Sequence, residues 1–84
     1  MLEVRDIVTL KDNKYMVISK VDLEDKFYFY IANIEKNEDF KFCYLEDDYL
    51  VEINNQALIQ KLIPMFTDQA MAELNNYIKN NQDS

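Results

Sequence analysis

Five segments in the first 53 residues alternate apolar with polar or aromatic side chains, which is the period of a β-strand. The alternation predicts strands over residues 2–10, 15–21, 26–33, 40–46 and 49–53. Asp6 interrupts the apolar parity of the first segment and indicates a bulge there. The connections are short and rich in Asp and Asn, which favour turns. Neighbouring strands should therefore pair antiparallel, in the order of the sequence.

The segment 26–33 shows the clearest division into two faces. Phe27 and Phe29 share one face, and Tyr28 and Tyr30 share the other. Phenylalanine has no polar atom to offer water, whereas tyrosine keeps a hydroxyl group. We therefore expect the Phe face in the core and the Tyr face on a partly wet surface.

Two other strands are assigned faces in the same way. In 15–21 the pattern places four side chains on one face: Tyr15, Val17, Ser19 and Val21. In 40–46 it places Phe40, Phe42 and Tyr44 on one face, which we expect to be the core face, and Lys41, Cys43 and Leu45 on the other. Cys43 is expected to be a small buried hydrophobic residue rather than a reactive thiol.

After residue 53 the apolar residues recur with helical spacing. We predict helices over 55–64 and 68–79, separated because Pro64 cannot donate a backbone hydrogen bond. Asn54 or Asn55 would cap the first helix and Thr67 the second, and residues 81–84 should fray. Residues 1–80 would then form a single α+β domain. Its sheet would be a five-stranded antiparallel meander, either twisted or a half-open barrel, followed by one or two C-terminal helices.

The chain carries 16 acidic and 9 basic side chains, a net charge of −7, and 13 of the 16 acidic residues lie in residues 1–53. Such a field repels nucleic acid phosphates, so direct nucleic acid binding is not expected. The same field favours a protein partner with a basic surface and speeds its encounter. Acidic residues also keep proteins soluble, which is the alternative explanation.

Several chemistries are excluded by missing residue types. The chain has no His and no Gly, and Cys43 is its single cysteine. A histidine base, a glycine phosphate loop and a zinc site are therefore excluded. We expect no catalytic residue, no cofactor and no metal ligand, and hence no enzyme activity. With no leader, no long apolar run and no internal disulfide, we expect a cytoplasmic protein without membrane contact.

Four stretches, "IVTLKDNKYMVISKV", "DKFYFYIAN", "FCYLEDDYLVEI" and "LIQKLIPMF", occur in an order that resembles the YrzB-like proteins of low-GC Gram-positive bacteria. These are small, acidic and uncharacterised. The resemblance covers about residues 7 to 66. It implies the same fold and a bacterial cytoplasmic setting, but no activity. The absence of glycine and the second helical segment depart from that family.

The acidic turns and the Tyr face are the candidate binding residues. We predict a non-enzymatic protein-interaction module that uses Tyr28, Tyr30 and six carboxylates: Asp22, Glu24, Asp25, Glu46, Asp47 and Asp48. The alternative for the tyrosines is that helices pack on their rings. A second hypothesis is a phage- or mobile-element-encoded inhibitor that presents carboxylates in place of phosphates, with Glu35, Glu38 and Asp39 added to the six. A homodimer through an exposed edge strand is a further alternative.

Overall fold

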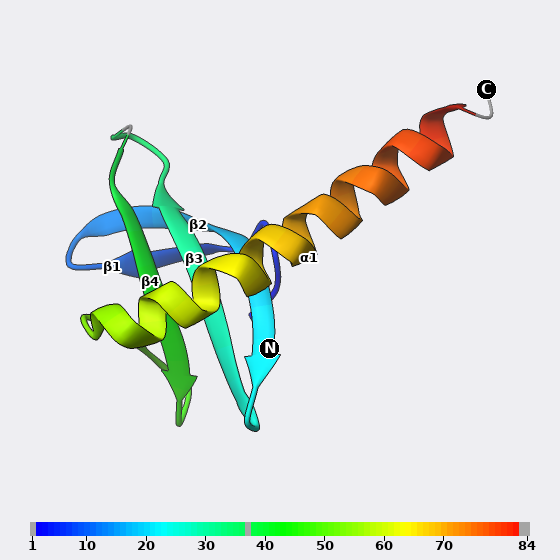
Figure 1. Cartoon of the computed structure of the whole chain (residues 1–84). Coiled ribbons are helices and arrows are strands. Elements are labelled where there is room, and N and C mark those ends of the chain that lie inside the picture. The colour runs from blue at the N-terminus through cyan, green and yellow to red at the C-terminus, as the bar shows by residue number, and fades with distance from the viewer. Residues whose placement is uncertain (1, 37, 83–84) are drawn as a thin grey trace.

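A computed structural model describes residues 2–36 and 38–82, the last three by their backbone. Its strands are β1 (Ile7–Leu10), β2 (Asn13–Leu23), β3 (Lys26–Asn33), β4 (Phe40–Glu46) and β5 (Tyr49–Glu52), and its helix is α1 (Gln56–Gln82). The strands pair antiparallel in the order β1-β2-β3-β4-β5 and curl into a half-barrel, against which the first half of α1 lies (Figure 1). The α+β meander predicted from the sequence is confirmed.

The sheet buries side chains on both of its faces. The inner cluster lies inside the curl of the sheet and consists of Tyr15, Val17, Phe29, Ile31 and Cys43. The outer cluster lies between the sheet and α1 and consists of Val21, Tyr28, Ile53, Leu62 and Phe66. Alternate side chains of one strand point to opposite faces. Strand β3 therefore contributes Phe29 to the inner cluster and Tyr28 to the outer cluster.

A bulge at Ile18 lets β2 contribute to both clusters. Val17 pairs with Ile31, but the next paired residue is Ser19, opposite Tyr30. The extra residue reverses which face each later side chain occupies. Val17 therefore lies in the inner cluster and Val21 in the outer one. The prediction that Tyr15, Val17, Ser19 and Val21 share a face is wrong beyond Val17.

The N-terminal segment is less regular than the sequence pattern suggests, and β1 begins at Ile7 rather than at residue 2. The amide of Arg5 donates to the carbonyl of Val17, and the amide of Val17 donates to the carbonyl of Asp6. Arg5 and Asp6 thus both form hydrogen bonds with the backbone of Val17, and Arg5 has a φ of 80°. The side chain of Asp6 accepts a hydrogen bond from the amide of Glu3 at 2.8 Å, which favours a turn over a strand there.

The Tyr face is covered by α1 instead of being wet. Tyr28 is 8% exposed and Tyr30 is half-buried. The ring centroids of Tyr30 and Phe66 are 6.1 Å apart, and those of Phe42 and Phe66 are 5.8 Å apart. Phe42 and Tyr44 pack in the outer cluster, whereas Cys43 lies in the inner one and is fully buried. The helix thus covers the Tyr face, which the sequence pattern alone does not indicate.

Helix α1 is continuous through Pro64, so the predicted break between two helices is wrong. The side chain of Asn55 caps its start, as predicted, by accepting from the amide of Leu58 at 3.2 Å. Thr67 is not a cap, because its hydroxyl donates to the carbonyl of Ile63 within the helix at 2.9 Å. Pro64 is exposed, so water can reach the carbonyl group that loses its donor.

Packing explains why the helix does not break. Leu62 is fully buried and Phe66 is 5% exposed, on either side of the proline. A continuous helix places both side chains on the face that meets the sheet. Burial of two large apolar side chains stabilises by about 3 to 6 kcal/mol, which offsets the local cost of about 3 kcal/mol for proline. The helix also reaches Gln82, beyond the predicted end at 79. Part of the predicted frayed tail is thus helical, and residues 83–84 lie outside the described residues.

Replacing the proline tests this continuity. Pro64→Ala restores a backbone donor without changing the buried face, so the free energy of unfolding should rise by about 2 kcal/mol. The helical signal in far-ultraviolet circular dichroism should stay unchanged, because residues 56–82 are already one helix. A clear gain in helical signal would contradict the continuous helix and support two helices separated at Pro64.

Candidate functional site

Three two-residue turns connect β1 to β2, β2 to β3 and β4 to β5. Their residues are Lys11–Asp12, Glu24–Asp25 and Asp47–Asp48, and all six have positive φ angles between 48° and 69°. Such hairpin turns require positive φ at both positions, where glycine is the usual residue. In a chain without glycine, Asp fits best because its short side chain tolerates this conformation. Turn geometry therefore accounts for Asp12, Asp25, Asp47 and Asp48, but not for Glu24.

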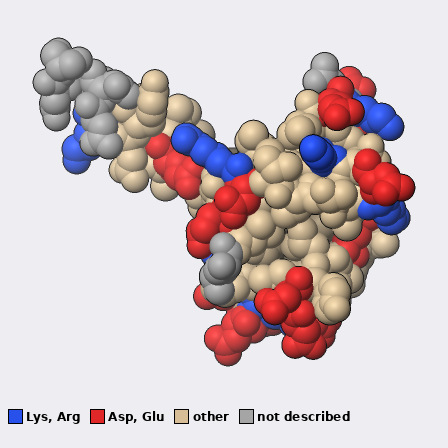
Figure 2. All heavy atoms as spheres, turned by 180° about the vertical axis from the view of Figure 1, so that it is seen from behind, with Lys and Arg blue, Asp and Glu red and all other residues tan. Residues whose placement is uncertain are grey.

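Two of the three turns lie at the same end of the sheet. An antiparallel meander places the β2–β3 and β4–β5 turns together, and the pairing of Tyr28 with Tyr44 joins their strands close to the turns. With the residues beside them, these turns bring six exposed carboxylates to what we call the acidic end: Asp22, Glu24, Asp25, Glu46, Asp47 and Asp48. Acidic side chains gather along the lower end of the molecule in Figure 2. The sequence prediction grouped the same six residues.

Two carboxylates at the opposite end of the sheet, Asp39 and Glu52, are paired within the fold. Asp39 accepts hydrogen bonds from the Nδ2 of Asn33 at 3.0 Å and from the hydroxyl of Tyr15 at 2.7 Å. These bonds hold the pKa of Asp39 below its ordinary value, and the bond to Asp39 raises the pKa of Tyr15. The Nζ of Lys41 lies 3.6 Å from Glu52. These acidic residues stabilise the loop and strand ends, and Asp39, predicted as part of a phosphate-like surface, belongs to this network instead.

The acidic end has no comparable compensation. None of its six carboxylates forms an ion pair or a side-chain hydrogen bond with another residue in the described part of the chain. Lys26 begins β3 beside them, but its Nζ lies over the ring of Tyr44, 4.6 Å from the centroid. Negative charges gathered without counterions lower the local electrostatic potential and attract cations or basic groups. The acidic end therefore exceeds what the turns or the fold require.

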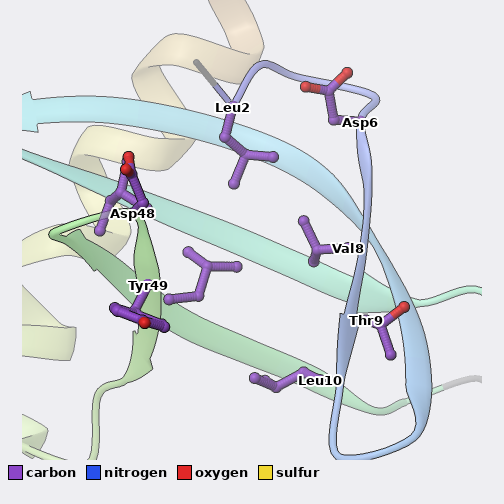
Figure 3. Close-up of a pocket in the computed structure, with 9 residues that line it drawn as sticks. Leu2, Asp6, Val8, Thr9, Leu10, Asp48 and Tyr49 are labelled. Atoms are coloured by element: carbon purple, nitrogen blue, oxygen red, sulfur yellow. The ribbon is translucent and has the colours of Figure 1, made fainter.

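A cleft opens beside the acidic end, at the seam of the half-barrel. Strands β1 and β5 are the two edges of the sheet and do not pair with each other. The cleft between them has a volume of about 580 Å³. Its lining residues are Leu2, Asp6, Val8, Thr9, Leu10, Leu45, Asp48, Tyr49 and Leu50. In Figure 3 the side chains of Leu2, Val8 and Leu10 project into the gap toward Tyr49 on β5.

The cleft and the acidic end meet at Asp48, which belongs to both. Tyr49, the next residue, is 74% exposed and forms one wall. Asp6 stands across the mouth of the cleft from Asp48 (Figure 3). At the other end of the seam, Lys11 and Glu52 form an ion pair at 3.9 Å across the gap. The seam thus offers an apolar hollow whose open mouth is flanked by carboxylates.

The structure separates the other predicted site residues from this surface. Glu35 and Glu38 lie with Asp39 in the β3–β4 connection, at the opposite end of the sheet. Tyr28 and Tyr30 lie under α1, as the alternative considered from the sequence allowed. Sequence reasoning missed the cleft, because no local signal shows how far a sheet curls or which edge strands face each other.

The described part of the chain shows neither a metal site nor a reactive thiol. Within residues 2–36 and 38–82, no group of three or more His, Cys, Asp or Glu residues is arranged to hold a metal ion. Cys43 is fully buried, and burial raises the pKa of its thiol to about 11. A thiol with so high a pKa is neither a good nucleophile nor a good metal ligand at neutral pH. The candidate site is therefore the acidic end together with the apolar cleft.

Comparison with known proteins adds no relative: no protein-family model, curated protein or solved structure matches the chain. Helix α1 is the one helix in the described residues, and it is not apolar enough to cross a membrane. The function must therefore be argued from the acidic end and the cleft.

The hydrogen-bond network of Asp39 can be tested by measuring stability as a function of pH. The lowered pKa of Asp39 stabilises the fold above the pKa of an unfolded Asp, about 3.9, and this contribution is lost as pH falls through the folded value. Asp39→Asn keeps the size of the side chain but removes the charge. The variant should be less stable than the original chain at neutral pH in urea unfolding. The gap should close below about pH 4. A gap that is constant or widens in acid would contradict the assigned network.

Proposed function

We propose that this protein is a non-enzymatic interaction module that binds a basic segment of another protein. The observation that carries the proposal is that the acidic end and the cleft share Asp48 and adjoin at Tyr49. A segment with Lys or Arg beside an apolar residue would satisfy both features at once. Its cations would face the six carboxylates, and its apolar side chain would enter the cleft.

The two features would contribute differently to binding. Exposed ion pairs are worth about 0.2 to 1 kcal/mol each and weaken in salt, so the acidic end supplies mainly a fast encounter and orientation. The cleft supplies apolar burial, worth about 1.5 to 3 kcal/mol for one large side chain. The unpaired edges of β1 and β5 also border the cleft, so an extended segment could add backbone hydrogen bonds to the sheet. Together these contributions predict a moderate binding affinity that falls as the salt concentration rises.

A second candidate is the inhibitor that imitates a nucleic acid backbone. The six exposed carboxylates at one end of the sheet, which have no partner among the described residues, favour it. Such a protein would occupy a channel that normally holds phosphates, and its binding would depend on charge alone rather than on the cleft. Binding should therefore depend on Tyr49 for the first candidate but not for the second.

The proposal places the module in the cytoplasm, supported by a single cysteine that is buried and free of any disulfide. A relation to the YrzB-like proteins stays a prediction and contributes no activity.

A labelled peptide rich in arginine, with one central leucine, tests the proposal by fluorescence anisotropy. We expect saturable binding that the triple variant Asp25→Asn, Asp47→Asn, Asp48→Asn weakens about tenfold at low salt. Asn tolerates positive φ as Asp does, so the turns should persist. The matched control is the triple variant Asp12→Asn, Glu35→Gln, Glu38→Gln, which removes three exposed charges at the opposite end and should bind like the original chain. Equal losses in both variants would contradict the assigned surface.

The cleft is tested separately with Tyr49→Ala, which removes one exposed wall and leaves the core intact. Weaker binding of the leucine peptide, with no change for a peptide carrying serine instead, supports the combined site. Binding that is insensitive to Tyr49→Ala but falls steeply with salt favours the phosphate imitation. Absence of binding at low salt would contradict both candidates.

A further inference from the structure

Helix α1 carries a second apolar face, beside the one that packs on the sheet, whose large side chains are about half exposed. At about 100° per residue, Ile63, Leu74 and Ile78 fall within a narrow stripe, roughly a third of a turn from Leu62, which is buried in the outer cluster. Their exposed fractions are 46%, 49% and 44%, and Met71 beside them is 51% exposed. We call this set the free stripe: Ile63, Thr67, Ala70, Met71, Leu74 and Ile78.

The second half of α1 lies away from the sheet (Figure 1). Every side chain from residue 71 to residue 79 is exposed, and the helix projects away from the domain (Figure 1). Gln69, before this half, is tied to the sheet by a hydrogen bond that its side chain accepts from the hydroxyl of Ser19. Isolated helical segments of this length are marginal in water and gain stability by packing an apolar face. A helix that continues to Gln82 therefore requires cover for the free stripe.

The free stripe begins at a groove between α1 and the sheet. The groove has a volume of about 310 Å³ and is lined by Tyr30, Phe42, Ile63, Phe66 and Thr67. Phe40 extends this apolar surface. It is 51% exposed and its ring stacks on that of Tyr30, with centroids 5.5 Å apart and planes 12° apart.

We propose that the free stripe pairs with the same stripe of a second copy, with the two helices antiparallel. A two-fold axis near Ala70 would place Leu74 of one copy beside Thr67 of the other. Ile78 of each copy would then enter the groove beside Ile63 of its partner. Thr67 and Ala70 are small and lie at the crossing, so the helices can approach closely there. The C-terminal end of the stripe in one copy would thus meet the groove at the N-terminal end of the stripe in the other copy, so the surface is self-complementary.

The area and charge of the surface suit a dimer. The large side chains of the stripe, with Phe40 and Tyr77, are 44 to 66% exposed and together offer about 600 Å² per copy. Two copies would bury about 1,200 Å², the lower end of the range for stable specific interfaces. Asp68 and Lys79 project from the other side of the helix. The acidic end lies at the bottom of the sheet, away from the projecting half of α1 (Figure 1), so like charges stay apart.

Sedimentation of the full chain tests the proposal. We expect a dimer at about 100 µM that dissociates on dilution. Leu74→Lys places a charge in the centre of the stripe and should weaken association more than tenfold. The matched control, Ala72→Lys, places the same charge on the opposite side of the same helical turn and should remain dimeric. The monomeric variant should also lose helical signal, because residues 70–82 then lack cover.

Cysteine crosslinking tests the orientation. Position 70 lies at the proposed two-fold axis, so Ala70→Cys should form a disulfide-linked dimer on mild oxidation, while Leu74→Cys should not. Efficient crosslinking of Leu74→Cys would overturn the antiparallel arrangement. An original chain that stays monomeric at about 100 µM would overturn the dimer.

Discussion

The two-sided burial of strand β3 is the constraint on which the rest of the structure depends. Phe29 and Ile31 point into the inner cluster, while Tyr28 points into the outer cluster beneath α1. An antiparallel sheet of this size often leaves one face to solvent. Here the curl of the sheet covers one face and the helix covers most of the other, so neither face offers a partner more than the groove beside α1.

This constraint decides where function can reside. A binding surface must lie at the ends of the strands, along the open seam or on the projecting half of α1. The two ends of the sheet differ in electrostatics, because Asp39 is bound by Asn33 and Tyr15 while the six carboxylates of the acidic end have no such partners in the described residues. The proposed site combines that end with the cleft at the seam. The proposed dimer uses the helix, so the two surfaces can operate together.

Periodicity predicted most of the fold, because the alternation over 26–33 and 40–46 matches strands β3 and β4. It predicted a partly wet Tyr face, however, and not its burial under α1. It failed where tertiary packing overrides a local rule. Ile18 looks like a regular strand residue, and a bulge there leaves no mark in a run of β-branched side chains. Pro64 breaks helices in isolation, but the burial of Leu62 and Phe66 outweighs that preference. The acidic end could be predicted from turn residues, whereas the cleft depends on the curvature of the whole sheet.

Nuclear magnetic resonance of isotope-labelled protein tests the central claim most directly, by mapping where the arginine-rich peptide with a central leucine binds. The account predicts that backbone amide signals shift at the β2–β3 and β4–β5 turns and along the cleft, from Val8 to Leu10 and around Tyr49. Signals of Tyr28 and Tyr30, beneath α1, should stay in place. Shifts confined to the strand centres and the helix that covers them would contradict it, because the partner would then have to displace α1 to reach a buried face.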